Sequence, residues 1–350
     1  MKYAEDSRNE KIDIIRGVSC ILIYLMHLYS EKNLPILDYK FIKNSSVFVD
    51  IFFLLSGYIL YEKYYSRINN KNEYLLFLRK RINRIYPLLL YAALVFLIFS
   101  LISECYLSNY KSINHTSKEY LFSLINSLFL FSATDLGLIS KYNFINSVSW
   151  TVSVEVLLYI LYGYIFTFKK NIKLILIIVL LTSLLLIIGQ KNSSIARGLF
   201  SFSIGIFTNI FKIKYRDKFE FFKKLFILLY IIIFLFLYYY SDLLIKNNLR
   251  YILIPLSFCP ILLNGFKIEF NTRIAIILKS LFKKIGQLSY SIYLNHTIVI
   301  IIALKSIIIF RINILNFTSQ FIFLLITTIV LLYYSLITYK YIEKIKIFRN

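Results

Sequence analysis

The sequence predicts an all-α membrane protein built as one bundle of about ten transmembrane helices. Hydrophobic residues make up 59% of the 350-residue chain, and the mean hydropathy is +0.69. These residues gather in repeated apolar runs of roughly 16 to 25 residues, the length that crosses a hydrocarbon core of about 30 Å. Because so little sequence lies outside the runs, we expect a single membrane domain over residues 1–350, with no fused extracytoplasmic domain.

The apolar runs follow one another along the chain with short polar segments between them. Residues 120–134 are apolar but too short to cross a membrane, so we expect an interfacial or re-entrant helix there. The predicted spans cover residues 12–30, 45–62, 85–103, 150–168, 172–188, 195–212, 224–240, 249–265, 286–310 and 318–339.

The distribution of charge predicts the orientation of the bundle. The formal net charge is +23, and Lys and Arg concentrate in alternate loops, on the same side as the N-terminus. Cytoplasmic loops of membrane proteins carry this excess of basic residues. Both termini are therefore expected in the cytoplasm, and the segregation by loop argues against a nucleic-acid partner.

The first predicted span contains two ionisable residues, Arg16 and His27. An Arg or His within hydrocarbon costs at least about 2 kcal/mol unless it faces a partner or a wet cavity, which makes it a candidate for function. Eleven residues of helix return to within about 20° of the starting direction and rise about 16 Å. The spacing therefore predicts that both side chains face the same interior path at different depths.

A carboxylate is expected near His27. Span 150–168 opens with Trp150, and Glu155 lies about 7 Å below its outer end by helical rise, a depth that resembles that of His27. A carboxylate beside an imidazole fixes its tautomer and raises its basicity, as a general base for a hydroxyl group requires. The alternative is that Glu155 and His27 each satisfy another buried partner or a water molecule. Ser153 shares this polar stretch.

Two other spans carry polar residues. In span 45–62, Ser56 and Gly57 are small residues that favour close helix packing, while Asp50 is either a carboxylate on the acceptor side or a group that reaches the interface. In span 286–310, hydrogen bonds between helices explain Asn295 well enough, whereas His296, about halfway across, is a candidate for lining the reaction path.

The densest basic cluster, RKRINRIYP at residues 79–87, precedes the third span. Arginines present planar forks to phosphate oxygens, so Arg81 and Arg84 are candidates for holding a polyphosphate such as coenzyme A. Contact with anionic lipid head groups is the competing explanation. The three cysteines show no metal-binding spacing, and no metal is expected.

Five motifs follow one another along the chain. They are Arg16 to His27, FFLLSG at 52–57, Arg81 and Arg84 before Tyr-Pro, WTVSVE at 150–155, and LSYSIYLNH at 288–296. In this order they resemble Arg-x10-His, FFxxSG, RxxR, WxxSxE and SYSxYLxH of the bacterial acyltransferase-3 family of integral-membrane O-acyltransferases, over nearly the whole chain. The resemblance implies transfer of an acyl group, usually acetyl, from cytoplasmic acyl-coenzyme A to a sugar hydroxyl of a surface polysaccharide or its lipid-linked precursor, in a bacterial inner membrane.

The resemblance also implies roles. Arg16, with the Arg81/Arg84 pair, would hold the donor, His27 would be the catalytic base or a transient acyl carrier, and Glu155 would orient His27. A separate extracytoplasmic protein is a further expected partner. A transporter or flippase for lipid-linked sugars is the alternative, because it would also need polar groups within the bundle. The residues expected to contact substrate are Arg81, Arg84, Asp50, Ser56, Trp150, Ser153, Asn295 and His296.

Overall fold

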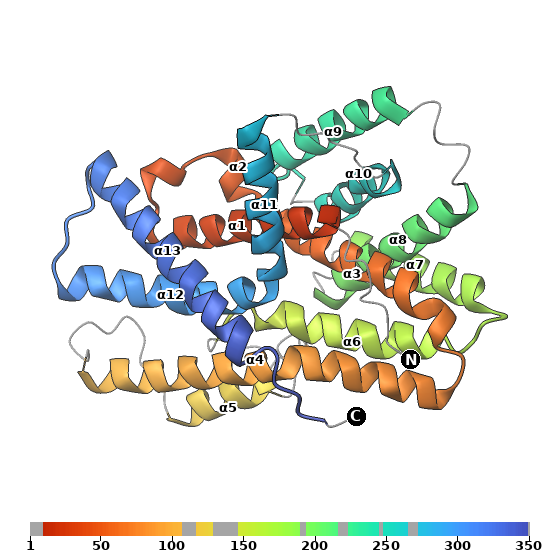
Figure 1. The fold of residues 1–350 in the computed structure, drawn as a ribbon, viewed down its shortest axis with the longest axis horizontal. Helices are drawn as coiled ribbons and strands as arrows, with labels where there is room; N and C mark the ends of the chain where they lie inside the picture. Colours follow the sequence, from red (N-terminus) through yellow and green to blue (C-terminus); the bar gives the residue numbers. More distant parts are fainter. Residues whose placement is uncertain are drawn as a thin grey trace.

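The chain folds into a helical bundle whose regular elements, over the residues described, are all helices (Figure 1). The computed structural model describes residues 10–106, 117–128, 146–189, 194–215, 223–244, 248–264 and 272–348. Its helices are α1 (Glu10–Lys32), α2 (Lys40–Lys43), α3 (Phe48–Tyr64), α4 (Lys71–Tyr106), α5 (Ser117–Leu128), α6 (Ser149–Ile165), α7 (Ile172–Ile188), α8 (Ser194–Lys214), α9 (Lys223–Tyr239), α10 (Arg250–Asn264), α11 (Arg273–Gln287), α12 (Ser289–Ile309) and α13 (Phe317–Tyr341).

Within the described ranges, six helical segments are long and apolar enough to cross a membrane. Three shorter apolar helices, α6, α7 and α10, lie among them. The all-helical, multi-pass class predicted from the sequence is therefore confirmed. The six segments are Glu10–Lys32, Lys40–Arg67, Lys71–Ile102, Ser194–Lys214, Ser289–Ile309 and Phe317–Tyr341.

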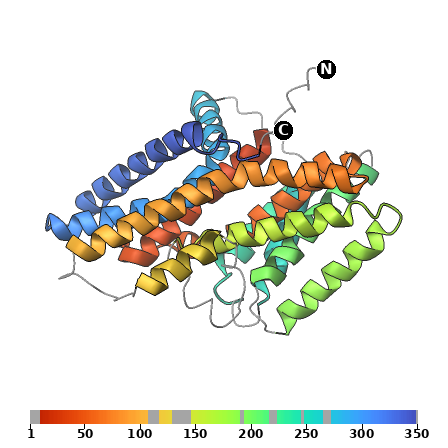
Figure 2. The same ribbon diagram turned by 90° about the horizontal axis from the view of Figure 1, so that it is seen from below.

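Helix α4 extends well beyond the apolar run that predicted it. It starts at Lys71, continues through Pro87 and has 36 residues, so it is about 54 Å long, against about 30 Å for a hydrocarbon core. Figure 2 shows it (orange) running along most of the molecule. The basic segment 79–87 is thus part of the same continuous helix as the membrane span.

The expected short helix before Trp150 lies partly within the described residues. Helix α5 has 12 residues, which corresponds to a length of about 18 Å and is too short to cross a membrane. Residues 129–134 of the expected segment 120–134 lie outside the described residues.

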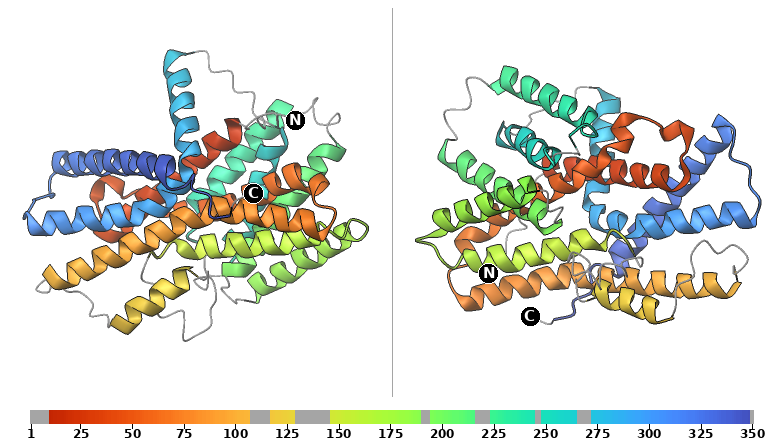
Figure 3. Two further views of the ribbon diagram at one scale, coloured as in Figure 1. Left: turned by 60° about the horizontal axis from the view of Figure 1, so that its bottom comes forward. Right: turned by 180° about the vertical axis from the view of Figure 1, so that it is seen from behind.

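The sequence analysis did not predict helix α11, most of which lies between the predicted spans 249–265 and 286–310. It is steeply inclined to α12 and α13 and projects from the bundle (Figure 3, left). Gly17 and Gly286 bring its backbone into contact with α1, since a Cβ atom at Gly286 would lie 1.7 Å from the carbonyl oxygen of Asp13. Glu10 adds ion pairs with Lys279 and Lys283.

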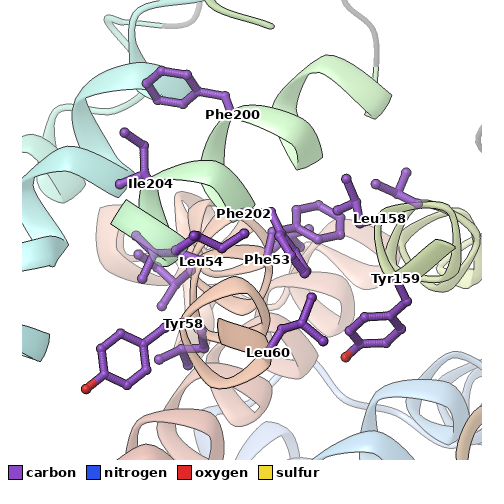
Figure 4. Packing of buried hydrophobic residues seen from close by; sticks show 14 of the residues in the cluster. Phe53, Leu54, Tyr58, Leu60, Leu158, Tyr159, Phe200, Phe202 and Ile204 are labelled. Atoms are coloured by element: carbon purple, nitrogen blue, oxygen red, sulfur yellow. The ribbon is translucent and has the colours of Figure 1, made fainter. Parts of the chain in front are cut away.

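The centre of the bundle is the contact between α3 and α8, where two glycines let the backbones touch. A Cβ atom at Gly57 would lie 2.2 Å from the carbonyl oxygen of Phe202, and one at Gly205 would lie 2.0 Å from that of Leu54. Around this contact Phe53 and Leu54 pack with Phe202 of α8 (Figure 4). The small residue at position 57 therefore has the packing role predicted for it.

Substituting Gly57 with alanine should destabilise the bundle. The new methyl group would force α3 and α8 apart, and overpacking of this kind costs about 1 to 3 kcal/mol. Thermal unfolding in detergent micelles measures the effect. Gly189→Ala, at the exposed C-cap of α7, is the matched control because a Cβ atom there meets only carbonyl oxygens of α7 itself, 3.2 Å from that of Leu185 and 4.0 Å from that of Leu186, and no neighbouring helix. Equal unfolding temperatures for the two variants would contradict the proposed packing role.

Candidate active site

A cavity of about 400 Å³, here called the basin, opens between the N-terminal half of α1, the C-terminal end of α3 and the N-terminal half of α4. Its charged side chains are mostly basic. Arg16, Arg81 and Arg84 all line it, so the structure brings together the three arginines that the sequence singled out. The remaining lining residues are Ile12, Asp13, Ile59, Glu62, Lys63, Tyr64, Gln287, Tyr339, Glu343 and Lys344.

Arg81 is held in place by aromatic rings. Its side chain is buried, and its guanidinium carbon lies 4.7 Å from the ring centre of Tyr64, 5.5 Å from that of Phe77 and 4.9 Å from that of Tyr159. Such contacts attract a cation to the face of a ring. Arg84 lies three residues further along the same face of α4 and is exposed. The ring contacts thus hold the Arg81 side chain in place at the edge of the basin, whereas the exposed Arg84 side chain can contact a ligand.

A second, inner cavity of about 60 Å³ shares one lining residue, Arg16, with the basin. Glu155 lines the inner cavity and accepts hydrogen bonds from Ser56 Oγ at 2.9 Å and from the Tyr159 hydroxyl at 2.6 Å. Ser56 therefore belongs to this cavity as well as to the helix contact beside it. The hydroxyl of Tyr290, another lining residue, donates to the Ile85 carbonyl at 2.7 Å.

His27 lies at a third, outer cavity of about 50 Å³, together with Glu31, Ser147 and Thr297. It is on the same helix as Arg16, about 16 Å further along the axis, and both residues border interior cavities. The other lining residues of the outer cavity are Phe96, Ile300 and Ile301.

Glu155 was expected beside His27, but the two residues line different cavities. The carboxylate shares a cavity with Arg16, and the ring of His296 lies against His27 instead, with ring centres 5.0 Å apart and planes at 41°. The physical reason is electrostatic: the attraction of Arg16 and Arg84 reaches the Glu155 carboxylate, and the hydroxyl groups of Ser56 and Tyr159 fix it there.

Two residues of α12 have different surroundings. His296 is 1% exposed, with Nδ1 2.7 Å from the carbonyl oxygen of Tyr293. The ring of Tyr293 lines the inner cavity and lies 5.7 Å from the His296 ring. Asn295 donates from Nδ2 to Thr338 Oγ1 at 2.7 Å, so it joins α12 to α13. Among the residues that the sequence placed on the reaction path, His296 thus lies between the inner and outer cavities, while Asn295 joins two helices.

Asp50 and Trp150 belong to a buried ion-pair cluster outside the three cavities. Asp50 accepts two hydrogen bonds from Arg197, at 3.2 Å to Oδ1 and 3.0 Å to Oδ2. The Arg197 guanidinium lies 5.4 Å from the ring centre of Trp150 and 4.0 Å from that of Tyr251. Arg197 lies within the predicted span 195–212, but the sequence analysis did not single it out. The signal for it was Asp50, a carboxylate within a predicted span that needs a partner.

Ser153, the remaining candidate, has a local role in the structure. It is fully buried, and its hydroxyl donates to the carbonyl oxygen of Ser149 one turn earlier in α6, at 3.2 Å. It does not line the basin, the inner cavity or the outer cavity.

Comparison with known proteins assigns a chemistry to this arrangement. Residues 9–337 match the model of the acyltransferase 3 family, which is described as an acyltransferase domain. An O-acetyl transferase of Shigella phage Sf6 is 27% identical over 186 residues, which cover 52% of this chain and 53% of the phage protein. The match therefore spans about half the length of that relative. No solved structure matches the chain significantly.

Proposed function

Because the chain belongs to the acyltransferase 3 family, we propose that it is a membrane O-acyltransferase that moves an acetyl group from cytoplasmic acetyl-coenzyme A to a sugar hydroxyl. One observation carries the proposal. Arg16 borders both the basin and the inner cavity, and the same helix presents His27 to the outer cavity. The donor and the acceptor would thus approach one helix from opposite ends.

The donor binds at the basin in this proposal. The phosphates of coenzyme A contact Arg84, Arg81 and Arg16, because a guanidinium makes two parallel, charge-assisted hydrogen bonds with a phosphate. The thioester then passes Arg16 and the inner cavity and reaches His27. This arrangement puts the basin on the cytoplasmic side, in agreement with the excess of basic residues there.

His27 is the general base. Its unprotonated nitrogen removes the proton of the acceptor hydroxyl as the oxygen attacks the thioester carbonyl carbon. The bond between carbon and sulfur breaks, coenzyme A leaves as a thiolate that takes up the proton, and an ester remains on the sugar. A path through acyl-His27 has the same products; incubation with labelled donor in the absence of acceptor would trap it on the protein.

The acceptor is a sugar of a bacterial surface polysaccharide or of its lipid-linked precursor. The similarity to an O-acetyl transferase supports acetyl as the acyl group and oxygen as the acceptor atom. In this proposal the enzyme lies in the inner membrane and acts alone or with a separate extracytoplasmic protein.

Comparing surface glycans from cells with and without the protein tests the proposal. We expect mass spectrometry to find an additional acetyl group, and NMR to locate it on one sugar hydroxyl. Glycans that are unchanged in structure but altered in surface amount would instead point to a transporter.

Purified protein should also be stabilised by acetyl-coenzyme A, by about 2.7 kcal/mol when the donor concentration is a hundred times its dissociation constant.

Arg84→Gln should weaken donor binding about 10- to 100-fold, because a hydrogen bond to a charged group contributes about 1.5 to 3 kcal/mol. The KM for acetyl-coenzyme A in a transfer assay measures this, while kcat with saturating donor should change little. Arg79→Gln is the matched control, since Arg79 is exposed on the same helix and does not line the basin. An equal rise in KM for both variants would show that overall charge, and not the basin, binds the donor.

A further inference from the structure

We infer that His296 is a positioning residue that accepts a hydrogen bond from His27 and so leaves the opposite nitrogen of His27 free to act as the base. The inference rests on the proposed function, in which His27 removes the acceptor proton. It assigns to a second imidazole the orienting role that was expected for Glu155.

The tautomer of His296 follows from the hydrogen bond of Nδ1. Nδ1 lies 2.7 Å from the carbonyl oxygen of Tyr293. A carbonyl oxygen only accepts hydrogen bonds, so Nδ1 must carry the proton. In a neutral imidazole the other nitrogen, Nε2, then holds a lone pair and acts as an acceptor.

That acceptor is buried and without a partner among the described side chains. His296 is 1% exposed, and Nε2 has no hydrogen-bond partner there. Buried polar atoms of native proteins are paired as a rule, and each exception needs an explanation. A donor must therefore be able to reach Nε2 at some stage of the enzyme's cycle.

His27 is the neighbour placed to be that donor. The two ring centres are 5.0 Å apart, and at this separation imidazole nitrogens that point toward one another are within hydrogen-bond reach. The planes are inclined at 41° in the structure. The proposed hydrogen bond requires the His27 ring to turn until its N–H points at the lone pair. The hydroxyl of Thr297, the next residue, already donates to Asn146 Oδ1 at 3.2 Å.

Glu155 already has hydrogen-bond partners elsewhere. Its carboxylate accepts from Ser56 and Tyr159 at the inner cavity, next to Arg16. His27, by contrast, lines the outer cavity, where the acceptor hydroxyl arrives in the proposed reaction. With one nitrogen donating to His296, the other is unprotonated and available to that hydroxyl. When His27 takes the proton, His296 Nε2 stabilises the imidazolium by accepting from it.

Two substitutions of His296 separate this role from a structural one. In His296→Gln, the side-chain amide reaches the position of Nε2 and keeps an acceptor there. In His296→Asn, the shorter amide reaches the position of Nδ1 and keeps the hydrogen bond to Tyr293 but not the acceptor. We expect the glutamine variant to retain kcat within about tenfold and the asparagine variant to lose roughly 100-fold, with KM for acetyl-coenzyme A unchanged in both.

The opposite order of activities overturns the inference, because a structural His296 needs only its bond to Tyr293, which asparagine preserves. Equal kcat values for the two variants overturn it as well. A wild-type protein that transfers no acetyl group from acetyl-coenzyme A would contradict the proposed function itself, and the inference with it. Transfer that depends on His27 but not on the residue at 296 would contradict the inference alone.

A spectroscopic measurement on the wild-type protein tests the inference even if the variants do not fold. The chain has three histidines, so 15N-histidine NMR of the wild-type protein in nanodiscs gives few signals to assign. We expect His296 to carry its proton on Nδ1 and to show a coupling to a proton donated by His27 across Nε2. A proton found on Nε2 of His296 would exclude the proposed hydrogen bond.

Discussion

His27→Ala is expected to lower acetyl transfer by about 10²- to 10⁴-fold, the usual contribution of a general base. The variant lacks the group that removes the acceptor proton, but the basin about 16 Å away along α1 is intact. Acetyl-coenzyme A should therefore still bind and stabilise the protein. Transfer to glycan, measured with labelled donor, reports the first effect, and the shift in unfolding temperature with donor reports the second.

The control for this experiment is the donor-induced stabilisation itself. A variant that loses both transfer and stabilisation has lost its fold or its basin, and says nothing about the base. A His27→Ala protein that folds, binds donor and transfers acetyl at the wild-type rate would refute the role of His27.

Breaking the buried pair of Asp50 and Arg197 is expected to have the largest effect on stability. Asp50 is 1% exposed and both of its oxygens accept hydrogen bonds from the guanidinium, so Arg197→Leu would leave a buried carboxylate without the side chain that bonds it. Removal of one partner of such a pair costs about 3 to 5 kcal/mol. Thermal unfolding in micelles should show the loss even in the presence of donor.

The double variant Asp50→Leu with Arg197→Leu is the matched control. Because it removes both members of the bonded pair, it should regain most of the stability lost in Arg197→Leu. If the double variant is less stable than the single one, the cluster with Trp150 and Tyr251 depends on the Arg197 side chain itself rather than on the ion pair.

The hydropathy profile predicts most of the helices of the fold, but it does not predict α11. The sequence of α11, RIAIILKSLFKKIGQ, places Lys279, Lys283 and Lys284 between apolar residues, so no continuous apolar run signals a helix. Its apolar side chains, such as Ile274 and Ile277, are exposed. The helix is amphipathic, and its place against α1 depends on backbone contacts that a hydropathy profile does not contain.

The relative positions of site residues could be predicted where both residues lie on one helix. Arg16 and His27 share α1, so helical geometry alone predicts their separation and common direction. Partners on different helices were harder to predict. Glu155 was expected beside His27, because its depth along one span does not determine which neighbour it meets, whereas in the structure its hydrogen bonds are with Ser56 and Tyr159. Arg197 could be paired with Asp50 only once α3 and α8 were packed together.

The rings of Tyr293, His296 and His27 are in contact one after another between the inner and outer cavities. If the acyl group crosses the membrane as in the proposed function, such a row of rings would act as a seal. The membrane would keep its ion gradients between turnovers, and the thioester would be protected from hydrolysis from the far side. Each turnover would then require an aromatic side chain to swing aside, so that its rate of opening sets an upper limit on kcat.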